Sequence, residues 1–136
     1  MTADVFADTV YWIAMIHLRD HWRELAVTAT NALGGRIIVT THEVLTEVLN
    51  AFAELGRPAR ETAALAMELI LARLDVRVLP QSADSFSDGF ALYRARPDKG
   101  YSLTDCISMA AMRRDGVIQI LTHDAHFRQE GFTTLL

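Results

Sequence analysis

Four acidic residues of this 136-residue sequence stand where carboxylates suit metal-dependent chemistry. Asp8 and Asp124 each follow a short apolar run that is typical of a buried strand. Asp105 opens an almost wholly apolar helical stretch. Glu47 lies about five residues into an amphipathic helical stretch, roughly 7 Å beyond its start at 1.5 Å per residue. We therefore expect one acid from each of four segments at the same edge of a sheet.

The chemistry follows from bringing these carboxylates together. Neighbouring carboxylates repel one another, and each has a raised pKa unless a positive charge lies among them. A hard divalent cation relieves the repulsion, and oxygen ligands favour Mg²⁺ or Mn²⁺. Such a cation also leaves positions for a substrate phosphate. The arrangement therefore suits hydrolysis of a phosphodiester bond by a metal-activated water.

Each acid also has a purely structural alternative. Asp8 is well placed to cap the helix that follows it. Asp105 and Asp124 fall in the first turns of helices, where acids complement the helix dipole. Glu47 lies on the polar face of its helix, where a solvated role is common. One acid alone is a weak signal, and the shared edge makes a stronger one.

Other polar residues near these acids are assigned structural roles. Thr40 and Glu43 have the spacing of a capping box, which favours a cap for Glu43 rather than a ligand role. His123 and His126 flank Asp124, and we expect local packing and polar contacts of them, because metal-assisted attack needs no histidine.

A basic loop precedes Asp105. Arg94, Arg96 and Lys99 lie in or beside the segment 96–100, which contains Pro97 and ends in a glycine. These side chains are candidates for contacts with RNA phosphates. A solvated charged loop is the alternative.

The rest of the chain alternates between strand-like and helix-like patterns. Strands are expected at residues 5–7, 36–40, 76–79, 117–121 and 132–135, and helices at 9–18, 22–33, 43–55, 60–74, 83–94 and 104–114. Strands separated by helices predict an α/β domain with a mainly parallel sheet covered on both faces. Ligands of such sheets collect beyond the carboxyl ends of the strands, where the four acids are expected. The chain length fits one domain spanning residues 1–136.

Composition narrows the class of protein. The sequence is 51% hydrophobic and carries a formal charge of −4, which is not the basic balance of a general nucleic-acid binder. Cys106 is the only cysteine, so no internal disulfide indicates an oxidising compartment. The sequence has no apolar run near the ~20 residues of a membrane span and no signal-peptide pattern at its start. We expect a cytoplasmic protein with no membrane association.

These residues resemble a known family. Val5-Phe6-Ala7-Asp8-Thr9 resembles the opening strand of PIN-domain nucleases, and in particular of the VapC-type toxins. The segment 39–50 resembles the one that carries the family's glutamate, with Glu47 the better match than Glu43. Ser102-Leu103-Thr104-Asp105-Cys106 resembles the third acidic motif. Residues 121–127, followed by Gly131-Phe132, resemble the C-terminal motif. The resemblance spans essentially the whole chain.

The resemblance implies a three-layer α/β/α sandwich with about five strands and a Mg²⁺- or Mn²⁺-dependent endoribonuclease. It implies that Asp8, Glu47, Asp105 and Asp124 are the catalytic metal ligands. Thr9, Thr104 and Thr122 are then expected to orient carboxylates or metal-bound waters through their hydroxyls. This role is compatible with capping. The implied partners are an RNA substrate, a small antitoxin that occludes the site, and a second copy in a homodimer.

Two other classes of function compete with this interpretation. A catalytically inactive PIN-like scaffold that binds RNA or protein is disfavoured, because an uncompensated acidic cluster is costly to retain. Phosphatases of the haloacid-dehalogenase type require Asp-x-Asp after the first strand, whereas this chain has Asp8-Thr9-Val10. A phospho-acceptor receiver domain requires a lysine after a late strand, and Lys99, the only lysine, precedes a helix instead.

Overall fold

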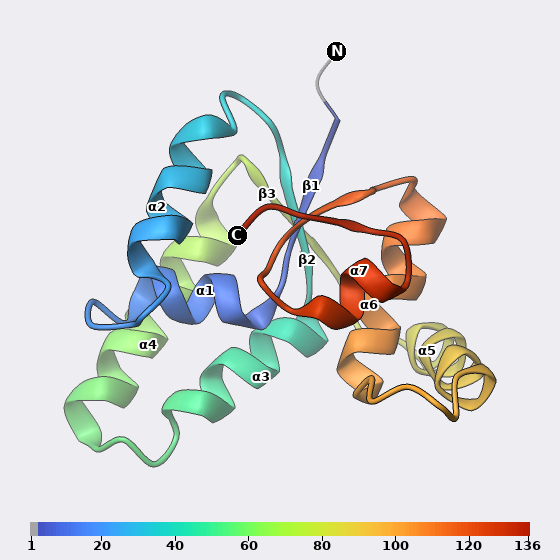
Figure 1. Ribbon diagram of the computed structural model, residues 1–136. Helices are drawn as coiled ribbons and strands as arrows, with labels where there is room; N and C mark the ends of the chain where they lie inside the picture. The colour runs from blue at the N-terminus through green and yellow to red at the C-terminus, as the bar shows by residue number, and fades with distance from the viewer. Residues whose placement is uncertain (1–2) are drawn as a thin grey trace.

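The computed structural model describes residues 3–136 and shows a parallel sheet between two layers of helices (Figure 1). Its five strands are β1 (Val5–Ala7), β2 (Ile38–Thr41), β3 (Val76–Leu79), β4 (Gln119–Leu121) and β5 (Thr133–Thr134). The strand order is β3-β2-β1-β4-β5, and every neighbouring pair is parallel. The expected α/β class and parallel sheet are therefore confirmed.

The helices cover both faces of this sheet. They are α1 (Thr9–Ile16), α2 (Arg23–Ala32), α3 (His42–Phe52), α4 (Arg57–Ala72), α5 (Ala83–Ala95), α6 (Leu103–Asp115) and α7 (Ala125–Gln129). In Figure 1, α1, α2 and α4 lie on one side of the sheet, and α5, α6 and α7 lie on the other. This three-layer arrangement agrees with the expectation. Among residues 3–136, no helix has the length and apolar character needed to cross a membrane.

The expected elements are all present, with shifted ends. The largest shifts are at the end of α3, which is Phe52 rather than Leu55, and at the start of α4, which is Arg57 rather than Arg60. Pro58 does not precede the helix but lies in its first turn, where its missing N–H costs no helical hydrogen bond. Only α7 had no expected range of its own.

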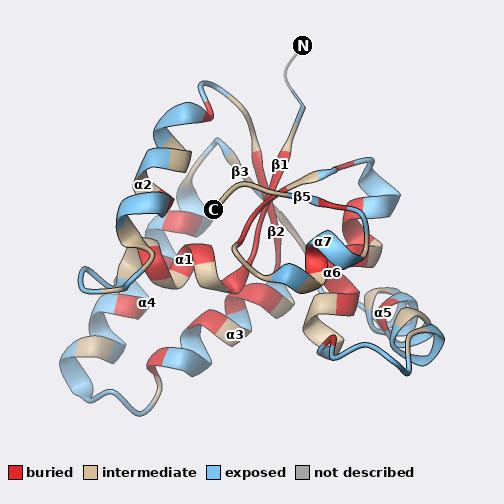
Figure 2. Ribbon diagram, in the orientation of Figure 1, coloured by how far each residue is buried: buried red, intermediate tan, exposed pale blue. Residues whose placement is uncertain are grey.

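The core is centred on β1, the middle strand of the sheet. All three residues of β1 are fully buried, and Figure 2 shows the neighbouring strands as buried too. Trp12 from α1 is buried against this sheet, and its Nε1 donates to Thr40 Oγ1 at 3.3 Å. Thr40 in turn donates to the carbonyl of Ala7 at 3.0 Å. These contacts fix the end of β1, where Asp8 follows.

The capping box expected of Thr40 and Glu43 is wrong. Thr41 is the N-cap of α3, and its hydroxyl accepts from the Val44 amide at 3.1 Å. Thr40 is instead buried in β2, which continues one residue further than expected. Glu43 reaches across to α5, where its Oε2 accepts from Ser85 Oγ at 2.7 Å.

Gly89 lets α5 and α6 pack closely, and its substitution is expected to destabilise the fold. A methyl group at Gly89 would lie 3.0 Å from both the backbone N and Cα of Ile107, and would also overlap the Cγ1 of that side chain. Rotation of a side chain cannot relieve contact with backbone. Gly89→Ala gains up to about 1 kcal/mol of helix propensity, but overpacking typically costs about 1–3 kcal/mol or more. We expect a net loss of about 1–2 kcal/mol in urea unfolding.

Gly35→Ala is the matched control for this prediction, because a methyl group at Gly35 meets no atom within 4 Å. Its unfolding midpoint is expected to stay close to that of the unsubstituted chain. A Gly89→Ala protein as stable as the control would show that the two helices can separate without cost.

Candidate active site

The carboxyl ends of β1, β2 and β4 lie at one edge of the sheet, and the four predicted acids follow them or lie close by. Asp8 directly follows β1, and Asp124 is the N-cap of α7 after β4. Glu47 is on α3, the helix that follows β2, and Asp105 is in the first turn of α6. The strand pairing therefore gathers segments that are more than 100 residues apart in sequence.

Asp8 is the most buried of these acids. Its side chain accepts a hydrogen bond from Thr122 Oγ1 at 3.0 Å and makes no capping bond to α1. Burial raises the pKa of Asp8 from 3.8 to about 7. The Thr9 amide and the Thr122 hydroxyl oppose this rise, whereas the charges of Asp105 and Glu47 add to it. The structural alternative, in which the Asp8 side chain caps α1, is therefore wrong.

Asp105 has two roles in the structure. It forms a capping box with Ser102, in which Asp105 N donates to Ser102 Oγ at 3.0 Å and Ser102 N donates to Asp105 Oδ2 at 3.3 Å. Burial raises the pKa of Asp105; the Ser102 amide opposes that rise, and the charges of Asp124 and Glu47 add to it. The structural alternative is therefore correct for Asp105, and the same carboxylate also faces two other predicted acids.

Asp124 and His126 form the part of the site nearest to Asp105. Asp124 Oδ1 accepts from the His126 amide at 2.9 Å, which caps α7. His126 Nδ1 lies 3.4 Å from Asp124 Oδ1 and 3.6 Å from Asp105 Oδ2. Potential ligand atoms of these three residues all lie within 4.8 Å of one another. Sequence reasoning expected packing and polar contacts of His126 beside Asp124, but it did not identify Asp105 as the second carboxylate.

Glu47 turns toward α1 rather than toward solvent alone. Its Oε1 accepts from Thr9 Oγ1 at 2.5 Å, and its side chain is partly buried. Thr9 and Thr122 thus donate hydrogen bonds to two of the predicted acids, Glu47 and Asp8. Thr104 is different, because its hydroxyl makes no hydrogen bond within the described part of the chain.

The electrostatics of the site are dominated by uncompensated negative charge. Among residues 3–136, no arginine or lysine forms an ion pair with the four acids, which are Asp8, Glu47, Asp105 and Asp124. Their donor set is oxygen, with one imidazole beside it. Burial is the main cause of the raised pKa values of Asp8 and Asp105, and the neighbouring carboxylates add to the rise. These residues fit a hard divalent cation.

His123, the other histidine near Asp124, packs as expected. Its ring stacks on Trp22 with a centroid distance of 3.9 Å and an interplanar angle of 14°. His123 therefore packs on Trp22, although it directly precedes Asp124 in the sequence.

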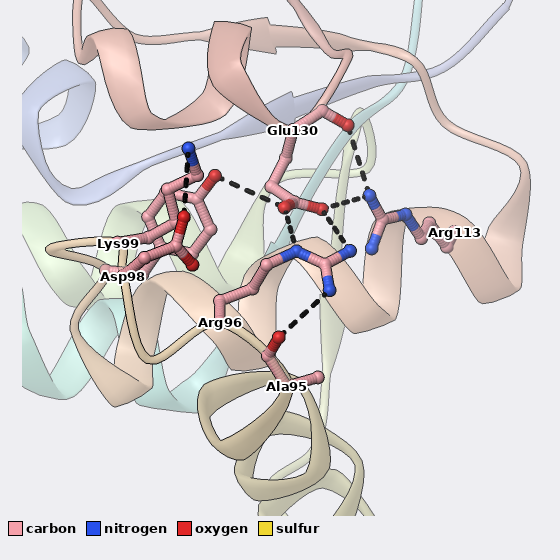
Figure 3. A network of polar contacts seen from close by, with 7 residues as sticks. Ala95, Arg96, Asp98, Lys99, Arg113 and Glu130 are labelled. Atoms are coloured by element: carbon pink, nitrogen blue, oxygen red, sulfur yellow. Dashed lines mark hydrogen bonds and ion pairs between the residues drawn. The ribbon is translucent and has the colours of Figure 1, made fainter.

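The basic loop is partly tied down by Glu130, as Figure 3 shows. Arg96 Nε donates to Glu130 Oε1 at 2.6 Å, and Tyr101 OH donates to the same oxygen at 3.2 Å. Arg113 Nη2 donates to Glu130 Oε2 as well. Burial alone would raise the pKa of Glu130, but the two arginines outweigh it and lower the pKa. Arg96 is therefore committed to a structural network.

Arg94 and Lys99, the other two residues predicted to contact RNA, have weaker contacts within the protein. The Arg94 guanidinium lies over the Phe90 ring, 5.8 Å from its centroid. Lys99 Nζ lies 3.6 Å from Asp98 Oδ2, in an ion pair whose members are both open to solvent.

Comparison with known proteins agrees with this architecture. The PIN domain model matches residues 5–132. The 23S rRNA-specific endonuclease VapC20 of Mycobacterium tuberculosis is 27% identical over 128 residues, which cover 94% of this chain and 95% of that protein.

Solved structures share the fold. VapC20 of M. tuberculosis, a sarcin–ricin loop cleaving toxin, superposes with a TM-score of 0.85 and 24% identity over 96% of this chain and 97% of that one. FitAcB from Neisseria gonorrhoeae gives a TM-score of 0.70 at 14% identity, over 97% and 96% of the two chains. VapBC2 from Rickettsia felis, bound to a promoter DNA fragment, gives 0.65 at 15%, over 96% of each. With the PIN model matching almost from end to end, the chain belongs to the PIN domain family.

Proposed function

We propose that this protein is a divalent-cation-dependent endoribonuclease of the VapC toxin type. The observation that carries the proposal is the acidic cluster itself. Four carboxylates gather at the carboxyl edge of the sheet without an arginine or lysine partner among residues 3–136, and one of them, Asp8, has a pKa raised to about 7. The similarity to a ribosomal RNA endonuclease over 94% of the chain supports the same conclusion.

Asp8, Glu47, Asp105 and Asp124 are the residues proposed to hold Mg²⁺ or Mn²⁺. When bound, such a cation neutralises charge on the phosphate and activates a water for attack on phosphorus. A cation at this site would relieve the repulsion between these carboxylates and favour their charged forms.

The threonines orient these carboxylates. Thr122 Oγ1 donates to Asp8 Oδ2 at 3.0 Å and accepts from the Asp124 amide at 3.1 Å, so one hydroxyl fixes both acids relative to each other. Thr9 fixes Glu47 in the same way. Hydrogen bonds of this kind limit the motion of ligands and favour one geometry.

RNA is the proposed substrate, and 23S ribosomal RNA is the first to test, because a relative acts on it. A small antitoxin is the proposed partner, supported by the likeness in fold to VapBC2 and to FitAB bound to DNA, with a TM-score of 0.71 for the latter. The homodimer and the cytoplasmic location stay predictions.

The decisive experiment compares Asp105→Asn with a matched acidic control. The asparagine side chain would keep an oxygen that can accept from Ser102 N, so the cap survives while the charge is lost. Asp88→Asn removes an exposed carboxylate in the middle of α5 that pairs with Arg114 in the last turn of α6. We expect Asp105→Asn to cleave about 100-fold more slowly or worse and Asp88→Asn to cleave normally.

The measurement is mapping of cut ends in purified 23S rRNA with Mg²⁺ or Mn²⁺, and in total RNA after induced expression. Equal cutting by wild type and Asp105→Asn would contradict the assignment of the site. Absence of metal-dependent cutting in every RNA would favour the alternative, a catalytically inactive PIN-like scaffold.

A further inference from the structure

An open pocket of about 540 Å³ lies between the C-terminal half of α5 and the loop that leads to α6. Its volume falls within the roughly 300–1,000 Å³ that is usual for small-ligand sites. Its lining combines the aromatic rings of Phe90, Tyr93 and Tyr101 with the cationic side chains of Arg94, Arg96 and Lys99.

The pocket adjoins the acidic cluster through His126. A methyl group at Gly100 would lie only 3.4 Å from His126 Nε2, so the loop backbone passes against the imidazole. The Tyr101 ring lies 5.4 Å from the His126 ring, edge to face. On its other side, His126 contacts Asp105 and Asp124. A ligand in the pocket is therefore one imidazole away from the proposed cation site.

Two aromatic rings in the pocket are open to solvent. Phe90 is 44% exposed and Tyr93 is 50% exposed, although both are large side chains that usually gain from burial. Arg94 lies over the Phe90 ring. Exposed rings combined with cations are the elements with which proteins bind single-stranded nucleic acid, since every base has a face to stack and each nucleotide carries a phosphate.

The cationic side chains around the pocket differ in whether an acidic partner neutralises their charge. The Arg96 charge is neutralised by Glu130, with which it also holds Tyr101 in place. Arg94 forms no ion pair within residues 3–136, and Lys99 has only the loose, exposed partner Asp98. Positive charge available to the phosphates of an RNA strand therefore comes from Arg94 and Lys99.

We propose that this pocket binds a nucleobase of single-stranded RNA close to the scissile phosphate. The base stacks on Phe90 and Tyr93, and Arg94 and Lys99 contact the adjoining phosphates. This inference rests on the proposed function for its substrate class. It adds the residues that select and hold the strand, as distinct from those that cleave it.

Binding without cleavage separates this inference from the proposed function. The probe is a fluorescein-labelled, single-stranded RNA of mixed sequence, measured by anisotropy with Mg²⁺ on an Asp8→Asn background that keeps the strand intact. A second probe of equal length lacks the bases at its central positions. The test variants are Phe90→Ala and Tyr93→Ala, both at exposed rings whose loss leaves the core unchanged.

The controls keep or move the aromatic ring. Tyr93→Phe retains the stacking face, and Phe86→Ala removes a 55% exposed ring one turn earlier on α5 that does not line the pocket. We expect each test variant to lose about tenfold or more in affinity for the intact RNA and to bind the abasic probe as its parent does. Both controls are expected to bind both probes normally.

Three results would overturn the inference. Unchanged affinity in Phe90→Ala and Tyr93→Ala excludes stacking there. Equal losses on both probes show a phosphate channel rather than a base pocket. Loss of a dimer on size-exclusion chromatography shows that a second copy covers the rings. Cleavage by the wild type, measured alongside, shows whether the proposed function stands regardless of these results.

Discussion

Asp8→Asn is expected to abolish RNA cleavage and at the same time to stabilise the metal-free protein at alkaline pH. Asp8 is buried among acids, and its charged form is costly there until a cation arrives. Asparagine has the same shape and still accepts from Thr122. It cannot supply the charge that a divalent cation requires, so we expect a loss of about 10³-fold in kcat.

The pH dependence follows from the direction of the shift in pKa. Asp8 has a pKa of 3.8 when unfolded and about 7 when folded, so the folded protein binds the proton more tightly. Stability from this group is therefore complete below about pH 4 and is lost as the pH rises through about 7. At pH values above 7 the loss reaches up to about 4 kcal/mol.

Urea unfolding in EDTA at about pH 5 and about pH 8 measures this effect. The advantage of Asp8→Asn over wild type is expected to grow between the two pH values, whereas Asp88→Asn, at an exposed position, shows no such trend. An Asp8→Asn protein that is less stable than wild type at the higher pH would show that the buried carboxylate is compensated in some other way.

Removal of divalent cations is expected to eliminate cleavage. Adding them back is expected to stabilise the fold and to release protons from the protein. Near pH 7 about half of the Asp8 carboxyls hold a proton, because the pKa is about 7, and a cation must displace it. Mn²⁺ at 100 times its Kd stabilises by about 2.7 kcal/mol. The stabilisation is measured as a shift in Tm.

Proton release is measured by titration calorimetry of Mn²⁺ in two buffers that differ in ionisation enthalpy. We expect roughly half a proton or more per ion at pH 7 and almost none at about pH 9. Asp8→Asn is the control and is expected to bind more weakly and to release fewer protons. Cleavage that persists in EDTA would rule out a cation-dependent reaction.

Much of the site is predictable because the carboxyl ends of parallel strands all lie at one edge of the sheet. A residue that directly follows such a strand must therefore lie at that edge. A buried strand ends at Ala7, and whatever follows it lies at the carboxyl edge, so Asp8 was placed without any knowledge of contacts. The same reasoning placed Asp124 after β4. For Glu47, helix geometry predicts only its distance from the start of the helix, through the rise per residue. Its choice over Glu43 came from the resemblance to PIN-domain nucleases.

The remaining features depend on contacts that leave no local pattern. The Arg96–Glu130 pair joins residues 34 apart in the chain, and neither neighbourhood indicates the other. His126 approaches Asp105 only because α7 turns directly after Asp124. The N-cap of α3 is Thr41 rather than the expected Thr40, because β2 continues one residue further than expected. Residue propensities do not resolve a difference of one residue at the end of an element.

The order of the strands has a consequence for the synthesis of this protein on the ribosome. The middle strand, β1, begins at Val5, yet one of its two neighbours, β4, begins at Gln119. Pairings so distant in sequence form late, because the intervening chain must exist before it can close. A nascent chain therefore carries Asp8 for more than 100 residues before Asp124 is made. The proposed site can be assembled only once both acids are present, so a nascent chain that stops before Asp124 is expected to have no nuclease activity.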